Sequence, residues 1–335
     1  MLTNNIMRRK RNKALKPALA AAICLLAGFV WYSAGLYRDR VQARNALVSK
    51  DTAVTVTAAT AGDRVESGGK TYRRNTYVKA VLCIGVDRRG EMKERTVPGS
   101  GGQADGIFLA AWDTARNTIR FLAIPRDTIT RITLTDLSGN VLGKDEQHIA
   151  LAYGYGDGRE QSCRYLSEAV SELLGGLKMD GYAAMNITAI SMLNDLVGGV
   201  EVTVDGTQRV LMGEQAEAFV RYRNIGVPQS ALERTERQKQ YIEGFSLAFR
   251  EKAGGSDSFV PDVMDQLSPY VITNLGKDQC LDMALAFSSG ENALGPQDLQ
   301  TLPGTAVETD LYDEYHPDRE AAQEMVLNLF YRVEK

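Results

Sequence analysis

Residues 106–125, "GIFLAAWDTARNTIRFLAIP", consist of two apolar runs on either side of the turn-forming residues "DTARN". This pattern predicts two antiparallel strands joined by a short turn. A third apolar and β-branched run, "YVKAVLCIGV" at 77–86, indicates a buried central strand. The segment between them, 87–105, is charged and rich in glycine, which predicts a long loop. We therefore expect these three strands to form the middle of one β-sheet.

Helical patterns alternate with further strand patterns after this hairpin. In 161–175, Leu166, Val170, Leu173 and Leu174 fall on one face of a helix. Mixed strands and helices in this order predict an α/β fold, an αβα sandwich with a mixed central sheet and helices on both faces. The further predicted elements are a strand at 180–187, a helix at 188–197, a strand at 198–204, and helices at 213–223 and 230–252.

The N-terminal segment predicts a membrane anchor. Residues 17–37 are 21 positions without a charge, which is long enough for a helix to cross a hydrocarbon core of about 30 Å. Residues 1–16 carry six basic residues and no acid, so this end should stay cytoplasmic and the body should be extracellular. A cleaved signal peptide is the alternative, but its apolar region usually has only about 7–15 residues. We expect a single-pass signal-anchor in the cell membrane.

The rest of the chain divides by composition. Residues 38–75 are small, polar and weakly patterned, and predict a linker or stalk. Residues 76–253 carry the main strand and helix patterns, and 254–335 are expected to be a helical part that packs on the same domain. The net charge of the whole chain is −3, so without the six basic residues of the first segment it is −9. An acidic body argues against a nucleic-acid partner.

The cysteines and histidines exclude two kinds of chemistry. The four cysteines and two histidines show no zinc-ligand spacing, and one histidine near the motifs cannot build a Ser-His-Asp set. Cys163 and Cys280 can form a disulfide outside the cell. Two small buried thiols are the alternative, and the sequence leaves both open.

Charged residues stand at the ends of the predicted strands. Asp87 directly follows the first strand, Asp105 directly precedes the second, and Arg126 and Asp127 follow the third. If the first two strands are neighbours, both aspartates meet at one sheet edge and the hairpin returns Arg126 to it, where ligands of open α/β sheets bind. Two carboxylates without a nearby histidine suit Mg²⁺, which takes its other ligands from water and phosphate. Each aspartate by itself is more often a turn former.

A second polar set lies on two later helices. Arg221 and Arg223 lie at the end of one predicted helix and alternate, so the helix ends between them if both side chains point the same way. Arg234 and Gln238 are i, i+4 neighbours on the next helix and share a face. Guanidinium groups present paired donors that match phosphate oxygens. In an otherwise acidic body, we interpret this set as an anion site. For Arg237 a solvated helix face is an equally good interpretation.

Seven short segments resemble the LytR-CpsA-Psr family of membrane-anchored envelope proteins. They follow the family's order and cover about half of the chain, roughly residues 78–245. The resemblance implies the family's αβα fold and its layout of one membrane helix before an extracellular domain. The segments are "LCIGVDRRG", "ADGIFLAAWD", "IRFLAIPRDT", "ALAYGYGDG", "LNDLVGGVEV", "EAFVRYR" and "RTERQKQ".

The resemblance also implies a chemistry. Family members bind a polyprenyl-pyrophosphate lipid that carries a glycopolymer, and transfer the glycan phosphate to a peptidoglycan hydroxyl. Asp87 and Asp105 match the aspartates associated with Mg²⁺, and Arg126, Asp127 and Asp105 are the expected catalytic residues. Asp127 either orients Arg126 or takes the hydroxyl proton, and we favour orientation because a carboxylate beside arginine is a poor base. The expected pyrophosphate-binding set is Arg89, Arg126, Arg221, Arg223, Arg234 and Gln238.

Three positions depart from the family pattern. Gln103 stands where an arginine is common, and His148 and Ala150 replace a lysine and an asparagine. Helix patterns at 189–197 and 217–223 are candidates to line an apolar groove for the lipid, although Met192 and Leu193 are more often simple core. The departures leave two alternatives, a non-catalytic lipid- or glycan-binding or regulatory envelope protein, and a pyrophosphatase that uses the same site.

Overall fold

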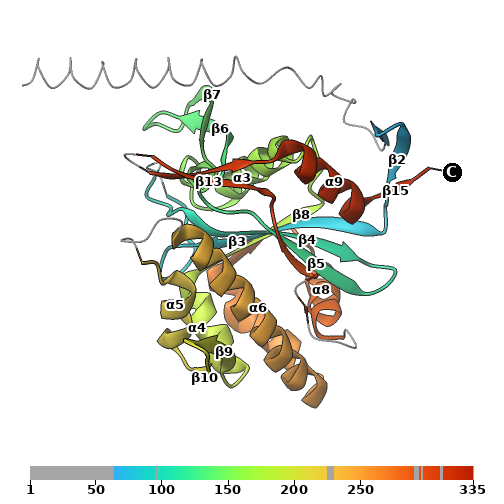
Figure 1. The fold of residues 1–335 in the computed structure, drawn as a ribbon. Coiled ribbons are helices and arrows are strands. Elements are labelled where there is room, and N and C mark those ends of the chain that lie inside the picture. The colour runs from blue at the N-terminus through green and yellow to red at the C-terminus, as the bar shows by residue number, and fades with distance from the viewer. Residues whose placement is uncertain are drawn as a thin grey trace, which may run out of the picture. The chain divides into compact units, whose positions relative to one another are not determined.

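A six-stranded mixed sheet lies at the centre of the computed structural model, in the order β11-β8-β3-β4-β5-β12 (Figure 1). The structure describes residues 64–334 except 96, 98, 225–229, 290–293, 296 and 310–311. β4 is antiparallel to both β3 and β5, which confirms the predicted hairpin, whereas β8 is parallel to β3 and β12 is parallel to β5. The strands are β3 (Val78–Val86), β4 (Ala104–Asp113), β5 (Thr118–Ala123), β8 (Gly181–Asn186), β11 (Val271–Thr273) and β12 (Leu299–Thr301).

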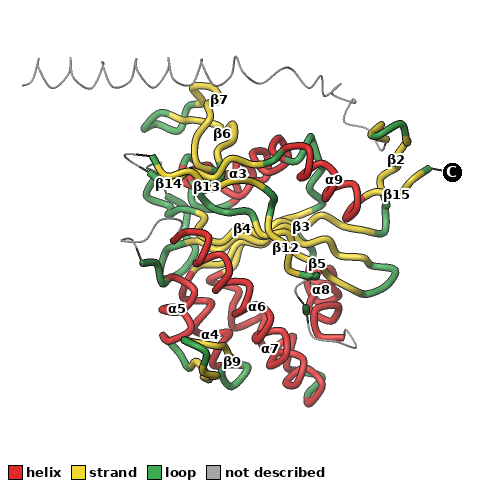
Figure 2. The backbone as a smooth tube through the Cα atoms, viewed as in Figure 1, coloured by secondary structure: helices red, strands yellow, loops and turns green. Residues whose placement is uncertain are grey.

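Helices cover both faces of this sheet (Figures 1 and 2). On one face α3 and α9 pack against the side chains of Leu82, Ile84 and Leu109 in the largest hydrophobic cluster. On the other face α6 and α8 pack against Phe108 and Phe121, so the predicted mixed α/β architecture is confirmed. The helices are α2 (Leu151–Gly154), α3 (Glu160–Leu173), α4 (Ile187–Leu196), α5 (Glu214–Arg221), α6 (Ser230–Gly255), α7 (Phe259–Leu267), η1 (Ser268–Tyr270), α8 (Lys277–Ser289) and α9 (Arg319–Phe330).

Short strands form the remaining sheets. Two of them, β1 and β2, lie inside the segment that composition predicted to be a stalk. They pair with each other, and β2 also pairs with β15 at the other end of the described chain. Residues 254–335 were expected to be helical, but they also supply β11 and β12, the two edges of the central sheet. The strands outside the central sheet are β1 (Arg64–Ser67), β2 (Lys70–Arg74), β6 (Ile129–Thr135), β7 (Val141–His148), β9 (Val200–Val204), β10 (Thr207–Leu211), β13 (Gly304–Glu308), β14 (Asp313–Pro317) and β15 (Tyr331–Val333).

These corrections share a physical reason. Strands of three to five residues are too short to show a clear alternating pattern. β2, β11 and β12 each form backbone hydrogen bonds with a strand far away in the chain. Composition therefore could not reveal that these segments are ordered by pairing with distant strands.

Three further predictions concern the membrane helix, the disulfide and the position of Asp105 in its strand. No helix within the described residues is long and apolar enough to cross a membrane, and the predicted anchor at 17–37 lies outside them. Cys83, Cys163 and Cys280 are free thiols, which decides against the disulfide between the last two. Asp105 does not precede its strand but is the second residue of β4.

The C-terminal helix is expected to be part of the core. Phe330 has no exposed surface and packs in the largest cluster, under the guanidinium of Arg74. Phe330→Ala should therefore lower the free energy of unfolding by about 3–5 kcal/mol, measured by urea denaturation. Val333→Ala, at a side chain that is half exposed, should change it by less than about 0.5 kcal/mol. Equal effects of the two substitutions would contradict this assignment.

Candidate active site

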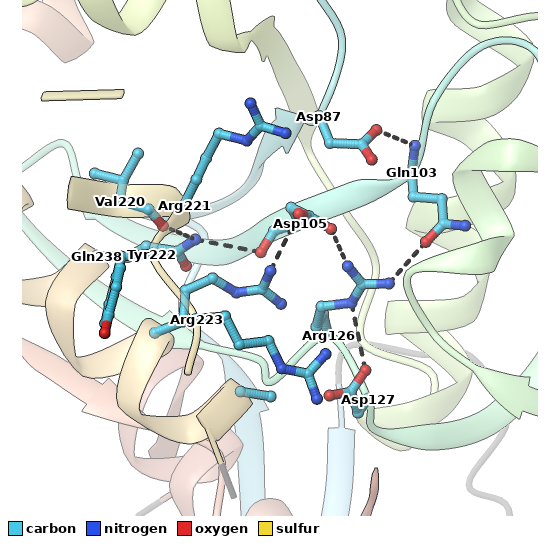
Figure 3. Close-up of polar contacts among 12 residues, drawn as sticks. Asp87, Gln103, Asp105, Arg126, Asp127, Val220, Arg221, Tyr222, Arg223 and Gln238 are labelled. Atoms are coloured by element: carbon cyan, nitrogen blue, oxygen red, sulfur yellow. Dashed lines mark hydrogen bonds and ion pairs between the residues drawn. The ribbon is translucent and has the colours of Figure 1, made fainter. Parts of the chain in front are cut away.

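The Asp105 carboxylate is the centre of a cluster of arginines at one edge of the central sheet (Figure 3). Its Oδ1 accepts a hydrogen bond from Arg126 Nη1, and its Oδ2 lies 3.2 Å from Arg234 Nη1. Gln238 Nε2 donates to the backbone oxygen of Asp105 at 3.4 Å. Because β4 and β5 are antiparallel, Arg126 returns to the end of the sheet where Asp105 stands. The structure therefore brings together four of the residues that the sequence predicted for the site.

Arg126 is held by hydrogen bonds from its two Nη atoms and by an ion pair between its Nε and Asp127. Its Nη2 donates to Gln103 Oε1 at 2.7 Å, and its Nε lies 3.3 Å from Asp127 Oδ1. Asp127 is itself buried, and its backbone oxygen accepts from Tyr315 N at 2.9 Å. The guanidinium thus has a defined orientation, and Gln103, which replaces an expected arginine, contributes to it by accepting a hydrogen bond.

Asp87 is placed by the loop that follows β3. Its Oδ1 accepts from the backbone N–H of Gln103 at 2.6 Å, and its own N–H donates to the Gln103 oxygen at 3.1 Å. Gly102 has a positive φ of 90°, and a Cβ there would lie 2.8 Å from Asp87 Oδ1. A glycine is needed at this position, because a side chain would be strained and would displace the carboxylate.

Arg234 is a buried cation next to this cluster. Its side chain is 7% exposed, and burial lowers its pKa, while the nearby Asp105 carboxylate opposes that shift. Arginine remains protonated in proteins despite such shifts. Its buried Nη2 has no hydrogen-bond partner within the described part of the chain, so it can donate to an anion without breaking an existing bond.

Arg89 and Arg221 form a second pair of cations. Both donate to the same oxygen of Glu217, Arg89 Nη2 at 2.7 Å and Arg221 Nη1 at 3.0 Å. The sequence reading missed Glu217, although its position four residues before Arg221 on a helix is a recognisable ion-pair spacing.

Arg223 has a different environment from the other predicted arginines. Its Nε donates to Ser230 Oγ at 2.8 Å, and its Nη2 donates to Asp313 Oδ2 at 2.6 Å. These contacts tie the end of α5 to the β13–β14 hairpin. Asp313 was not predicted, because nothing local in the sequence links it to a residue 90 positions earlier.

His148 is the last residue of β7, and Ala150 lies in the turn that follows it. Ala150 N donates to the backbone oxygen of Arg126 at 3.2 Å, and Ala150 is fully buried. The His148 ring packs edge-to-face on Tyr312 with 5.8 Å between centroids. Neither side chain supplies a cation comparable to the expected lysine.

An apolar cavity of about 250 Å³ opens beside the cluster, between the sheet and the helices of one face. Gly85 and Gly106, paired across β3 and β4, leave room for it because they have no side chain. Burial raises the pKa of Cys83 in its wall to about 12, so that this thiol stays neutral. Four of the lining residues are charged or carry an amide, namely Asp87, Asp105, Arg221 and Gln238. The apolar lining residues include Phe108, Met185, Ile190, Leu193, Val220, Phe245 and Phe287.

The two aspartates can hold a magnesium ion only together with water and phosphate oxygens of a substrate. No group of three or more histidine, cysteine, aspartate or glutamate side chains within the described residues could hold a metal ion. Asp105 already accepts from two arginines and Asp87 from one N–H, but a carboxylate offers about four acceptor positions. One or two carboxylates completed by substrate phosphate oxygens and water are a usual Mg²⁺ site. The residues therefore fit an ion that arrives with a phosphate ligand.

Comparison with known families decides the classification. Residues 45–209 and 204–330 match the LytR_cpsA_psr family. The chain belongs to this family. The LytR-CpsA-Psr resemblance of the seven sequence segments is thereby confirmed over most of the chain.

Known relatives are similar in sequence and in fold. The teichoic acid transferase TagU of Bacillus anthracis is 30% identical over 218 residues, which cover 61% of this chain and 63% of that protein. Protein gbs0355 of Streptococcus agalactiae has the same fold, with a TM-score of 0.60, 19% identity, and coverage of 76% of this chain and 88% of that one. TagV of B. subtilis aligns with a TM-score of 0.55 and 19% identity over 76% and 98% of the two chains. The chain thus spans about three-fifths of the length of the curated relative.

Asp105 is expected to be required for stability. Asp105→Ala leaves Arg126 and the buried Arg234 without their shared carboxylate, and an uncompensated buried charge costs about 3–5 kcal/mol. Urea denaturation should show a loss of that size. Glu168→Ala, which removes a surface partner 3.9 Å from Arg164, should cost less than about 1 kcal/mol. A loss no larger than that of Glu168→Ala would show that Asp105 does not hold the two arginines.

Proposed function

We propose that this LytR-CpsA-Psr protein transfers a glycopolymer phosphate from a polyprenyl-pyrophosphate carrier to a peptidoglycan hydroxyl, at the outer face of the cell membrane to which residues 17–37 anchor it. The observation that carries this proposal is one apolar cavity lined at its polar end by Asp87, Asp105 and Arg221. Arg126 and Arg234 bind the carboxylate of Asp105. A ligand that fits both parts has a long hydrocarbon chain and an anionic headgroup. A prenyl pyrophosphate has both.

The cavity supports the lipid part of the proposal. Its wall is built from aromatic and aliphatic side chains of β3, β4, β5, β8 and four helices, and pockets of this composition bind apolar ligands. Leu193 and Val220 come from the two helix segments that the sequence suggested for a groove, whereas Met192 is not among the lining residues.

The charges of the cluster support a divalent cation. Five arginines form ion pairs with four carboxylates, and Asp87, which accepts from a backbone N–H, is the fifth acid. A bound pyrophosphate therefore adds negative charge to a group whose formal charges are already balanced. Buried charges need partners, and Mg²⁺ held by Asp87 and Asp105 would supply the missing positive charge and act as a Lewis acid on the phosphate oxygens. The arginines are Arg89, Arg126, Arg221, Arg223 and Arg234, and the carboxylates are Asp87, Asp105, Asp127, Glu217 and Asp313.

The proposed reaction is a displacement at the phosphorus that carries the glycan. The oxygen of the peptidoglycan hydroxyl forms a bond to this phosphorus, and the bond from phosphorus to the bridging oxygen breaks. Polyprenyl phosphate leaves with the bridging oxygen and takes up the hydroxyl proton. Protein catalysis of such transfers is mostly positioning and charge stabilisation. Arg126, oriented by Asp127, and the unpartnered Nη2 of Arg234 are the donors that would stabilise the negative charge on the phosphate oxygens. The named activity of the curated relatives, teichoic acid transfer to peptidoglycan, supports this reaction class.

Transfer is expected to depend on Arg126. The assay uses the purified full chain with a synthetic polyprenyl-pyrophosphate glycan, Mg²⁺ and peptidoglycan oligomers. Arg126→Ala should slow transfer by about 100-fold or more, because an oriented donor to the reacting phosphate is lost. Arg116→Ala is the control, since this arginine is 82% exposed and contacts Asp113 in the β4–β5 turn.

The products of the same assay separate the candidate functions. Glycan phosphate on peptidoglycan indicates a transferase, free glycan phosphate indicates a pyrophosphatase, and bound substrate without products indicates a binding protein. Removal of Mg²⁺ by a chelator should stop the reaction, and added Mg²⁺ should restore it. A wild-type rate in Arg126→Ala would exclude the proposed role of this arginine.

The cavity is expected to bind the lipid chain. Ile190→Trp should fill part of it and weaken the binding of geranylgeranyl pyrophosphate about tenfold, which corresponds to about 1.4 kcal/mol. Binding of inorganic pyrophosphate, which has no chain, should not change. Both affinities can be measured by calorimetric titration in the presence of Mg²⁺. An equal loss for the two ligands would place the effect at the headgroup site and not in the cavity.

A further inference from the structure

Glu217 is a buried carboxylate beside the polar end of the cavity. It lies on α5, one turn before Arg221, and its side chain is 4% exposed. One oxygen, Oε1, accepts from both Arg89 and Arg221. The other, Oε2, is buried and has no hydrogen-bond partner within the part of the chain that the structure describes. One carboxylate thus connects the loop after β3 to the end of α5.

The fold gains little from burying this carboxylate, apart from its place in the first turn of α5, where an acidic residue is favourable. The side chains of Arg89 and Arg221 are 60% and 48% exposed, so water would solvate them without Glu217. Glu217 is the partner that loses its hydration, and an unpaired buried oxygen is unfavourable. Its helix neighbours Ala216 and Val220 are buried apolar residues, and an apolar side chain at 217 would suit the same surroundings. A buried group that lowers stability is often retained for a functional reason.

The two arginines are well placed to act together on a ligand. Arg221 lines the cavity together with Asp87 and Asp105. In Figure 3 its guanidinium lies on the side of Asp105 that faces Asp87, whereas Arg126 lies on the other side. Each guanidinium has five N–H donors, so a bond to Glu217 leaves donors for phosphate oxygens.

We propose that Glu217 is a positioning residue of the headgroup site, which aligns Arg89 and Arg221 on the second phosphate of a pyrophosphate while Arg126 and Arg234 bind the first. This inference rests on the proposed pyrophosphate-binding function. Long exposed arginines lose conformational entropy when they bind a ligand, and a fixed carboxylate reduces that loss in advance. The bridge therefore favours a pyrophosphate over a monophosphate, that is, the donor over the released lipid.

Glu217 has two opposite physical effects on phosphate binding, and the experiment distinguishes them. A carboxylate next to two arginines also repels a phosphate and competes for their donors. If competition dominated, removal of the Glu217 charge would tighten binding. If positioning dominates, removal of the acceptor oxygen weakens binding, and a neutral side chain that keeps an acceptor oxygen preserves most of it.

The experiment compares Glu217→Met, Glu217→Gln and the control Glu214→Gln on the same helix, where Glu214 is exposed. The full chain is titrated with geranylgeranyl pyrophosphate and with geranylgeranyl monophosphate, both with Mg²⁺, and thermal unfolding is recorded. Glu217→Met should weaken pyrophosphate binding about tenfold, with a smaller effect on the monophosphate and no loss of Tm. Glu217→Gln should remain within about threefold of the wild type, because its amide oxygen still accepts hydrogen bonds.

A double-mutant cycle gives a second measurement. Arg221→Ala should weaken pyrophosphate binding in the wild type but have a smaller effect in Glu217→Met, because the arginine is no longer aligned there. Tighter or unchanged pyrophosphate binding in Glu217→Met would overturn the proposal. A loss of affinity that Glu217→Gln shares and that comes with a lower Tm would overturn it as well.

The result also separates this inference from the proposed function. If the wild type does not bind the pyrophosphate probe, both are overturned. If Arg126→Ala abolishes binding and Glu217→Met leaves it unchanged, the inference about Glu217 alone is wrong.

Discussion

The Asp105 carboxylate, shared by Arg126 and Arg234, is the contact on which the arrangement of the site depends. It joins the start of β4, the loop after β5 and the long helix α6. A buried guanidinium such as Arg234 is tolerated only beside a compensating charge. Because Asp105 stands on a central strand of a rigid sheet, the arginines that it holds are fixed with the same precision as the sheet.

The sheet determines the site in a second way. Gly85 and Gly106 pair across β3 and β4 and leave space below the sheet, while the aspartates stand where these two strands end and begin. The apolar cavity and the charged cluster therefore share one wall. Under the proposed function, an amphiphilic ligand would place its chain in the first and its headgroup in the second. The position of Glu217 extends this cluster to the loop after β3.

Local pattern explains which parts could be predicted. The hairpin at 106–125 was found because both strands and their turn are contiguous, and its antiparallel pairing brings Arg126 near Asp105 without further information. Glu217 was missed although its spacing to Arg221 was visible, because burial, which makes it unusual, cannot be read from the spacing. The three-residue strands β11 and β12 were missed because each is stabilised by a distant partner. Asp313 was missed for the same reason.

The sequence by itself determined the mixed α/β class, the membership of the LytR-CpsA-Psr family and the arginines and aspartates of the candidate site. These depend on short-range periodicity and on motifs that keep their order along the chain. The tertiary structure alone decided that Arg234 meets Asp105 and Arg223 meets Asp313, and that the cavity adjoins this cluster. It also decided that Cys163 and Cys280 stay unpaired and that both chain ends of the described body join in one small sheet. Such contacts are set by packing between residues far apart in the chain, and no local pattern encodes them.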